Sequence, residues 1–175
     1  MKLHISDKLV SEEAISNTPK RWKSFMKEYE RKRKPFNFTC FENLNYDQMI
    51  ILRDIDFSSM CEHHALPFRG KVSIGYIPKD IICGASKIAR TVDMFASKPQ
   101  LQEQLTQDIA NFLWEKLQPY GLMIVIEATH DCMRIRGVMK NNSVLVTSAV
   151  KGSFEKLEVR TEFLNLVRRN GNALA

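Results

Sequence analysis

The chain has 175 residues, of which 44% are hydrophobic and 26% charged, and these proportions favour one globular domain over fibrous or wholly disordered proteins. Its formal net charge of +6 favours an anionic partner such as nucleic acid, a membrane surface or a polyphosphate. No apolar run reaches the roughly 18 residues that a membrane span needs, and residues 1–10 lack the pattern of a signal peptide, so we expect a cytoplasmic protein.

An N-terminal helical segment is predicted over residues 1–45. A helical pattern covers 9–33, with a predicted break near Asn17, because Thr18 suits an N-cap and Pro19 the first position of a new helix. Many basic residues lie in this segment: Lys20, Arg21, Lys23, Lys27, Arg31, Lys32, Arg33 and Lys34. This run permits an anionic ligand, but it is as readily a charged helix face in solvent.

Residues 46–175 are predicted to form a single functional domain. Its first part contains two strands, over 51–59 and 72–77, because apolar and polar residues alternate there. Two helices follow. The first is predicted to be capped by Ser86, and the second to begin at residues 97–99.

The second part of this domain is predicted to contain two more strands, over about 122–136 and 143–151, joined by a turn at 140–142. A last amphipathic helix covers 155–169. This order predicts an α+β fold with a four-stranded antiparallel sheet and helices packed on one face. Open sheet edges make self-association plausible.

Two short clusters of cysteine and histidine suggest chemistry. Cys61 and His64 are spaced so that a thiolate and an imidazole can reach one metal ion. If the second cluster lies on a strand, His130 and Cys132 point the same way, and Cys132 becomes a third ligand. Three protein ligands leave a position for water, as in catalytic zinc sites. His63 and His130 would then stand beside the metal as acid–base groups.

The spacing alone leaves a second interpretation open. A single Cys-x-x-His pair also occurs by chance, and free cysteines are often small core residues. Cys40 and Cys83 have no cysteine or histidine beside them, so we interpret them as core or surface thiols. No disulfide framework is expected.

Longer motifs surround these clusters and keep one order along the chain. They are Met60-Cys61-Glu62-His63-His64, Gly84-Ala85-Ser86-Lys87-Ile88-Ala89-Arg90, Gln102-Glu103-Gln104-Leu105-Thr106, Glu127-Ala128-Thr129-His130-Asp131-Cys132-Met133 and Arg136-Gly137. In sequence and spacing they resemble the zinc-dependent GTP cyclohydrolase I family over roughly residues 14–170. The resemblance implies the T-fold, which oligomerises into a ring-like barrel, and a homodecamer of two five-membered rings with active sites between subunits.

The resemblance also implies a reaction. Members of the family are hydrolases that act on cyclic amidine carbon–nitrogen bonds and use one zinc ion per subunit. They open the guanine imidazole ring of GTP at C8, release formate, rearrange the ribose and close a pterin ring to give 7,8-dihydroneopterin triphosphate. That product feeds tetrahydrofolate and other pterin pathways, or the formation of 7-deazaguanine nucleosides.

Roles for single residues follow from the same resemblance. Cys61, His64 and Cys132 match the zinc ligands. His63 matches the histidine thought to protonate the purine imidazole nitrogen, and His130 the histidine near the ribose that assists ring opening. The matches to substrate-contacting residues are Glu103 beside Gln102 at the guanine edge, Ser86, Lys87, Arg90 and Arg136 around the ribose and triphosphate, and Arg21 at the triphosphate.

Other functions remain possible on the sequence alone. One is a catalytically idle, nucleotide-binding or regulatory T-fold protein, although the complete set of cysteines and histidines argues against it. Another is nucleic-acid binding by the basic N-terminal segment. A related reductase of deazaguanine biosynthesis shares the T-fold but lacks this ligand set and uses a nucleophilic cysteine.

Overall fold

A computed structural model describes residues 11–168 of the chain. The parts of the predicted segments at residues 1–10 and 169–175 lie outside the described residues. The elements are α1 (Glu12–Tyr29), β1 (Cys40–Glu42), β2 (Ile50–Cys61), β3 (Pro67–Ile77), β4 (Ile81–Cys83), α2 (Ala85–Ala96), β5 (Pro99–Gln100), α3 (Gln102–Leu117), β6 (Gly121–His130), α4 (Asp131–Arg134), β7 (Leu145–Gly152) and α5 (Leu157–Val167). Within residues 11–168, no helix has both the length and the hydropathy to cross a bilayer.

One sheet forms the centre of the molecule, with its strands in the order β5-β2-β3-β6-β7. The four long strands pair antiparallel, which confirms the predicted α+β fold and antiparallel sheet. The two-residue β5 adds a fifth strand, parallel to the end of β2, which the sequence did not predict. Strands β1 and β4 form a separate antiparallel ribbon.

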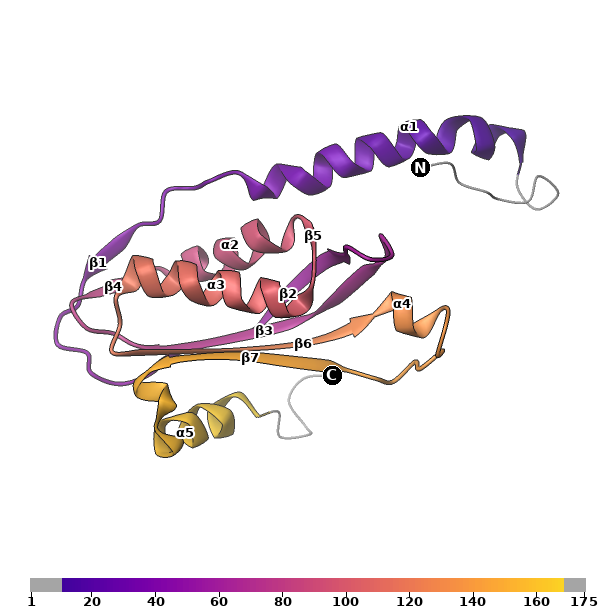
Figure 1. Cartoon of the computed structure of the whole chain (residues 1–175). Coiled ribbons are helices and arrows are strands. Elements are labelled where there is room, and N and C mark those ends of the chain that lie inside the picture. Colours follow the sequence, from indigo (N-terminus) through magenta and orange to yellow (C-terminus); the bar gives the residue numbers. More distant parts are fainter. Residues whose placement is uncertain (1–10, 169–175) are drawn as a thin grey trace, which may run out of the picture.

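Helices cover both faces of this sheet, so the prediction of helices on one face only is wrong (Figure 1). Helices α2 and α3 pack on one face and bury Ile88, Leu105 and Ile109 against it. Helix α5 lies on the other face, where Phe163 packs in a second cluster with Met123 and Phe154. The long strands carry apolar residues on both sides, and each apolar face needs a cover.

Helix α1 is continuous, so the predicted break near Asn17 is wrong. The helix begins after Ser11, whose hydroxyl accepts a hydrogen bond from the Ala14 N–H at 3.2 Å. Pro19 lies inside the helix, where it removes one backbone donor while the neighbouring turns continue. The far end of α1 is held by Tyr29, whose hydroxyl donates to the Ala96 carbonyl at 2.7 Å.

The starts of the next two helices also differ from the prediction. The N-cap of α2 is Gly84, and Ser86 lies inside the first turn without a capping hydrogen bond. Helix α3 begins at Gln102 and not at residues 97–99, because the preceding backbone pairs with β2 as β5. This pairing brings the first turn of α3 next to Cys61, which faces Gln100 in the ladder.

Candidate metal centre and active site

A tight turn after β2 brings the first two candidate ligands together. The Cys61 N–H donates to the Leu66 carbonyl, and the Cys61 carbonyl accepts from the Ala65 N–H, both at 2.9 Å. Ala65 has a φ of 52°, in the left-handed region that reverses the chain direction within a few residues. As a result, Cys61 Sγ lies 3.8 Å from His64 Nδ1.

Cys132 reaches this turn from a short helix, not from a strand as predicted. Strand β6 ends at His130, and the chain then forms α4. The carboxylate of Asp131 binds Arg69 on β3 at 2.6 Å and Arg134 in α4 at 3.5 Å. This pair of contacts holds the turn into α4, which directs Cys132 toward Cys61.

The three candidate ligands form one compact donor set. One sulfur or nitrogen atom from each of Cys61, His64 and Cys132 lies within 4.8 Å of the others. Burial and the neighbouring Cys61 thiol raise the pKa of Cys132, whereas the nearby Arg136 lowers it. A cation between the two sulfurs would offset the repulsion between their thiolates. Two thiolates and one imidazole suit a zinc ion and leave a position free.

His130 lies at the end of β6, beside this donor set in the chain. Its ring stacks on Phe68, with the two centroids 4.6 Å apart and an angle of 2° between the planes. Its Nε2 lies 2.9 Å from Oε1 of Gln102. Burial lowers the pKa of His130, and the negative charge of Glu103 opposes that shift. Glu103 follows Gln102 directly in the chain.

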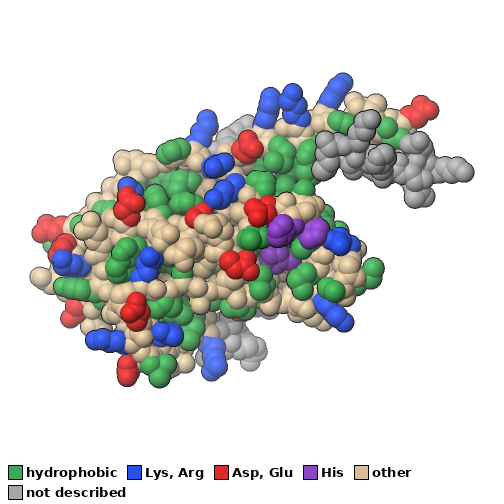
Figure 2. Space-filling view, viewed as in Figure 1, with side chains coloured by type: hydrophobic (Ala, Val, Ile, Leu, Met, Phe, Trp, Pro, Cys, Tyr) green, Lys and Arg blue, Asp and Glu red, His purple; other side chains and the backbone are tan. Residues whose placement is uncertain are grey.

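His63 lies in the same turn as His64, and both are exposed. Its side chain is 64% exposed, and its ring centroid lies 6.2 Å from that of His64. The histidine side chains gather at one end of the molecule, with acidic side chains beside them (Figure 2). The acidic side chains of this surface can accept hydrogen bonds from a ligand, and the histidines can donate a proton to it.

The structure places several predicted substrate contacts elsewhere. Strand β3 has 11 residues, so at about 3.3 Å per residue its ends lie roughly 30 Å apart. The candidate metal ligands lie near its beginning, where Met60 pairs with Pro67. The segment that leads into α2 lies at its other end, where the Cys83 N–H meets the Tyr76 hydroxyl at 3.4 Å. Within one chain, Ser86 and Lys87 at the start of α2 are therefore distant from Cys61.

The remaining predicted contacts differ in their surroundings. Arg90 follows Lys87 by about one helical turn and is exposed. Arg21 pairs with Glu13 on the same face of α1. Gln102 is only 1% exposed, and the chain itself uses its amide group. The single chain thus brings the three candidate metal ligands together and places His63 beside His64. Gln102 joins His130 to the first turn of α3, which carries Glu103, and Arg136 follows Cys132 by four residues.

Three residues that shape the site were missed by sequence reasoning. Phe68 supports the ring of His130, Asp131 holds the turn into α4, and Gln100 pairs with Cys61 in the sheet. No sequence pattern marks Gln100 or Asp131, because their partners are far away in the chain. Gln100 pairs with Cys61, 39 residues earlier, and Asp131 binds Arg69, 62 residues earlier. Only the motif around His130, which contains Asp131, could have drawn attention to one of them.

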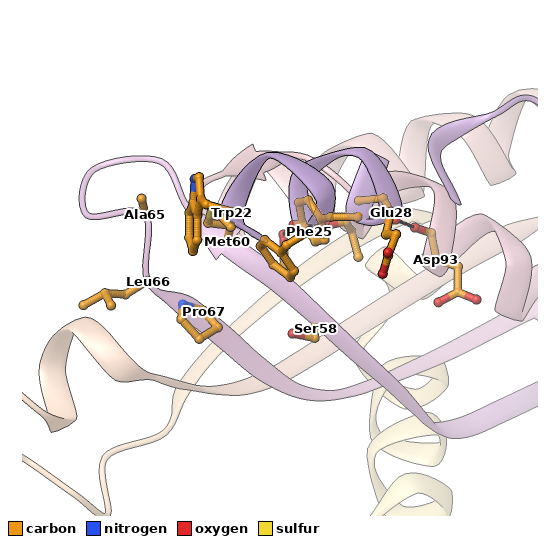
Figure 3. A pocket seen from close by; sticks show the side chains of 13 residues that line it. Trp22, Phe25, Glu28, Ser58, Met60, Ala65, Leu66, Pro67 and Asp93 are labelled. Atoms are coloured by element: carbon orange, nitrogen blue, oxygen red, sulfur yellow. Dashed lines mark hydrogen bonds between the residues drawn. The ribbon is translucent and has the colours of Figure 1, made fainter. Parts of the chain in front are cut away.

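A separate apolar pocket of about 570 Å³ lies between α1 and the adjoining ends of β2 and β3. Trp22 and Phe25 of α1 face Met60, Leu66 and Pro67 across it (Figure 3). None of the predicted site residues lines this pocket. The candidate chemistry therefore lies on the open surface around the Cys61 turn and not in this pocket.

Comparison with known proteins gives a consistent result. A model of the GTP cyclohydrolase I family matches residues 1–168. GTP cyclohydrolase 1 from Sulfurihydrogenibium sp. (strain YO3AOP1) is 48% identical over 157 residues, covering 89% of this chain and 83% of the relative. GTP cyclohydrolase 1 from Aquifex aeolicus is 49% identical over 158 residues, covering 89% of this chain and 85% of the relative.

A solved structure supports the fold. The archaeosine synthase QueF-Like in its apo form matches with a TM-score of 0.53, covering 62% of this chain and 98% of that protein. Its sequence identity is only 16%, so the likeness concerns the fold alone.

Proposed function

This chain belongs to the GTP cyclohydrolase I family and is an enzyme of that type, and from this premise we propose how its own residues carry the reaction on GTP. The main support is the convergence of Cys61, His64 and Cys132, with donor atoms within 4.8 Å of one another. His130 and His63 flank these residues in sequence. A protein that only binds nucleotides would not need this donor set.

We propose zinc as the metal, held by Cys61, His64 and Cys132. The donor set of two thiolates and one imidazole is typical of zinc and unsuited to magnesium or calcium, which prefer oxygen ligands. Bound there, zinc would supply Lewis-acid activation of water at neutral pH.

The neighbouring residues would handle protons and orientation. His63, exposed at the turn, would protonate the imidazole nitrogen of the purine as the ring opens at C8. His130 would assist the opening of the ribose. Arg136, whose positive charge reaches Cys132, would contact the phosphates at the same end of the molecule. The product would be 7,8-dihydroneopterin triphosphate, with formate released from C8.

Glu103 would select guanine. The guanine edge offers two donors, N1–H and the 2-amino group, and one carboxylate can accept both. Adenine lacks this pair of donors and would leave the carboxylate unmatched. Glu103 is exposed in the first turn of α3 and lies near His130, which supports this role.

Replacing Glu103 with glutamine should lower kcat/KM for GTP about 10- to 100-fold, because an ionic hydrogen bond to the guanine edge is lost. Steady-state kinetics with GTP would measure this. Glu115→Gln, at the far end of the same helix, is the matched control and should leave kcat/KM unchanged. Equal kinetics for the Glu103 variant and the wild type would rule out the guanine contact.

We further propose that the working enzyme is a homo-oligomer, as a decamer of two five-membered rings, in which a second copy supplies the α2 residues. The support is the separation of Ser86 and Lys87 from Cys61 in one chain. The open edge of β7 supports it too, because this strand pairs only with β6 among residues 11–168.

Co-expression of two inactive variants tests the shared site. His63→Ala and Arg90→Met should each be nearly inactive alone. Their co-expression should restore part of the activity, because some sites then combine an intact His63 from one copy with an intact Arg90 from another. Co-expressed protein that is no more active than either parent would place both residues in the same subunit's site.

The whole proposal is tested by incubating the zinc-loaded protein with GTP and following the fluorescent pterin product together with formate. Metal analysis of the same sample gives the zinc content per subunit. Binding of GTP with no pterin from zinc-loaded protein would favour the idle nucleotide-binding alternative.

A further inference from the structure

The side chain of Gln102 is buried in a closed hydrogen-bond network. Its Nε2 lies 3.1 Å from the Ile126 carbonyl, 3.0 Å from the Leu145 carbonyl and 3.1 Å from Thr147 Oγ1. These partners come from β6 and β7, while Gln102 begins α3. The network therefore fixes the helix and two strands relative to one another.

The orientation of this amide is determined by its partners. Backbone carbonyls only accept hydrogen bonds, so the group that faces Ile126 and Leu145 must be the NH2 group. The opposite orientation would place Oε1 against two carbonyl oxygens with no hydrogen between them. Oε1 of Gln102 must therefore point toward His130 and act as an acceptor.

A chain of two threonines supports the same assignment. The Thr106 hydroxyl donates to the Gln102 carbonyl at 2.8 Å, so its single hydrogen is used. Thr147 lies 2.7 Å from Thr106 and must then donate to it. Thr147 Oγ1 is left as an acceptor for the Gln102 amide. All three contacts of the Gln102 nitrogen are then with acceptors, and its two hydrogens are shared among them.

The orientation of the Gln102 amide determines which nitrogen of the His130 imidazole carries the proton. Its Nε2 lies 2.9 Å from an oxygen that can only accept, so Nε2 must carry the proton. The stack on the buried ring of Phe68 fixes the plane of the imidazole. In the neutral ring Nδ1 then carries the lone pair, and within residues 11–168 it has no hydrogen-bond partner.

We propose that Gln102 is a positioning residue that holds His130 in the Nε2–H tautomer and leaves Nδ1 as the nitrogen that accepts the substrate's proton. This replaces the predicted contact between Gln102 and substrate, since the side chain is only 1% exposed. The inference rests on the proposed role of His130 in ribose opening. It assigns the proton transfer to one of the two ring nitrogens.

The test reads the tautomer directly. The zinc-loaded enzyme, labelled with 15N in its four histidines, is studied without GTP by solid-state 15N NMR above the pKa range of histidine. The resonances of His130 are assigned by their loss in His130→Gln. We expect a protonated Nε2 and an unprotonated Nδ1. A protonated Nδ1 in the wild-type enzyme would overturn the proposal without any variant.

Two variants separate positioning from packing. Gln102→Met removes the acceptor at similar volume, and His130 should then show a mixture of tautomers. Thr147→Val is the matched control, because the Gln102 NH2 group keeps both carbonyl partners, so the Nε2–H tautomer should persist. The same tautomer mixture in Thr147→Val would mean that general loosening, and not Oε1, sets the proton position.

Kinetics with GTP give an independent readout. For Gln102→Met we expect kcat to fall about 10-fold or more, because the imidazole presents the wrong nitrogen in part of the molecules, while KM stays within about twofold. A raised KM with unchanged kcat would instead mean that Gln102 binds substrate. If the wild-type enzyme does not turn over GTP, the proposed function fails, while the NMR experiment still tests the tautomer.

Discussion

Cys132→Ala is expected to lose both bound zinc and GTP turnover while the fold persists. Zinc affinity should fall by at least about 100-fold, because even residues that merely support a ligand contribute 10- to 100-fold. The two ligands that remain, Cys61 and His64, belong to one turn and offer the metal an incomplete shell. Metal analysis after dialysis and the pterin fluorescence assay measure the two losses.

Cys40→Ala is the matched control for this experiment. Cys40 lies in β1 and pairs with Cys83 in the separate ribbon, so its loss should leave the zinc content at one per subunit. A chelator should reproduce the Cys132→Ala phenotype in the wild-type protein, and added zinc should reverse it. If Cys132→Ala retained stoichiometric zinc and activity, the assigned ligand set would be wrong.

Gly70→Ala is expected to have the largest effect on the fold. A Cβ atom at Gly70 would lie 1.8 Å from the carbonyl oxygen of Glu127 and 2.7 Å from Cα of Ala128. Both are backbone atoms of the neighbouring strand β6, so no side chain can rotate away. The pairing of β3 with β6 would have to open, at a cost of about 4 kcal/mol or more in the free energy of unfolding.

Urea unfolding followed by circular dichroism measures this change, and soluble yield reports it if the variant does not fold. Gly84→Ala is the matched control, because a Cβ there meets only Ser86 Oγ, at 3.9 Å. Its free energy of unfolding should fall by only about 1 kcal/mol, because alanine is a poorer N-cap of α2 than glycine. Equal stability for the Gly70 and Gly84 variants would contradict the close approach of the two strands.

The sequence predicted the parts of this molecule that depend on local patterns. Alternating apolar residues were sufficient for the long antiparallel strands. The Cys-x-x-His spacing singled out Cys61 and His64 as candidate ligands, although a chance pair remained open until the family resemblance was considered. The third candidate ligand, Cys132, was proposed by an incorrect route. Cys132 reaches its partners through α4, which depends on the ion pair between Asp131 and Arg69, and no local pattern contains a contact across 62 residues.

Two other features depend on distant parts of the chain. Strand β5 has only two residues and exists because Gln100 pairs with Cys61, so its sequence carries no strand pattern. Helix α5 covers the far face because Gly75 leaves room there. A Cβ atom at Gly75 would lie 2.6 Å from the ring of Phe163. Neither arrangement can be inferred from the periodicity of a single segment.

The motifs identified candidate residues without indicating which of them share one chain's site. Ser86 and Lys87 belong to the same family pattern as Cys61, yet they lie at the start of α2, whereas the end of that helix is the part near Cys61. Gln102 is an example of a motif residue whose burial could not be predicted from the motif. Its place beside Glu103 suggested a contact with substrate, while its tertiary contacts enclose it completely.

The two-residue pairing of β5 with β2 also connects the residue proposed to hold the metal with the segment proposed to hold the purine base. Cys61, which would hold the metal, faces Gln100, and Glu103, which would hold the base, follows three residues later. A ligand that orders β2 at Cys61 would lower the entropic cost of ordering β5 at Gln100, and the reverse also holds. If zinc changes the affinity for GTP through this ladder, GTP must change the affinity for zinc by the same factor, as thermodynamic reciprocity requires.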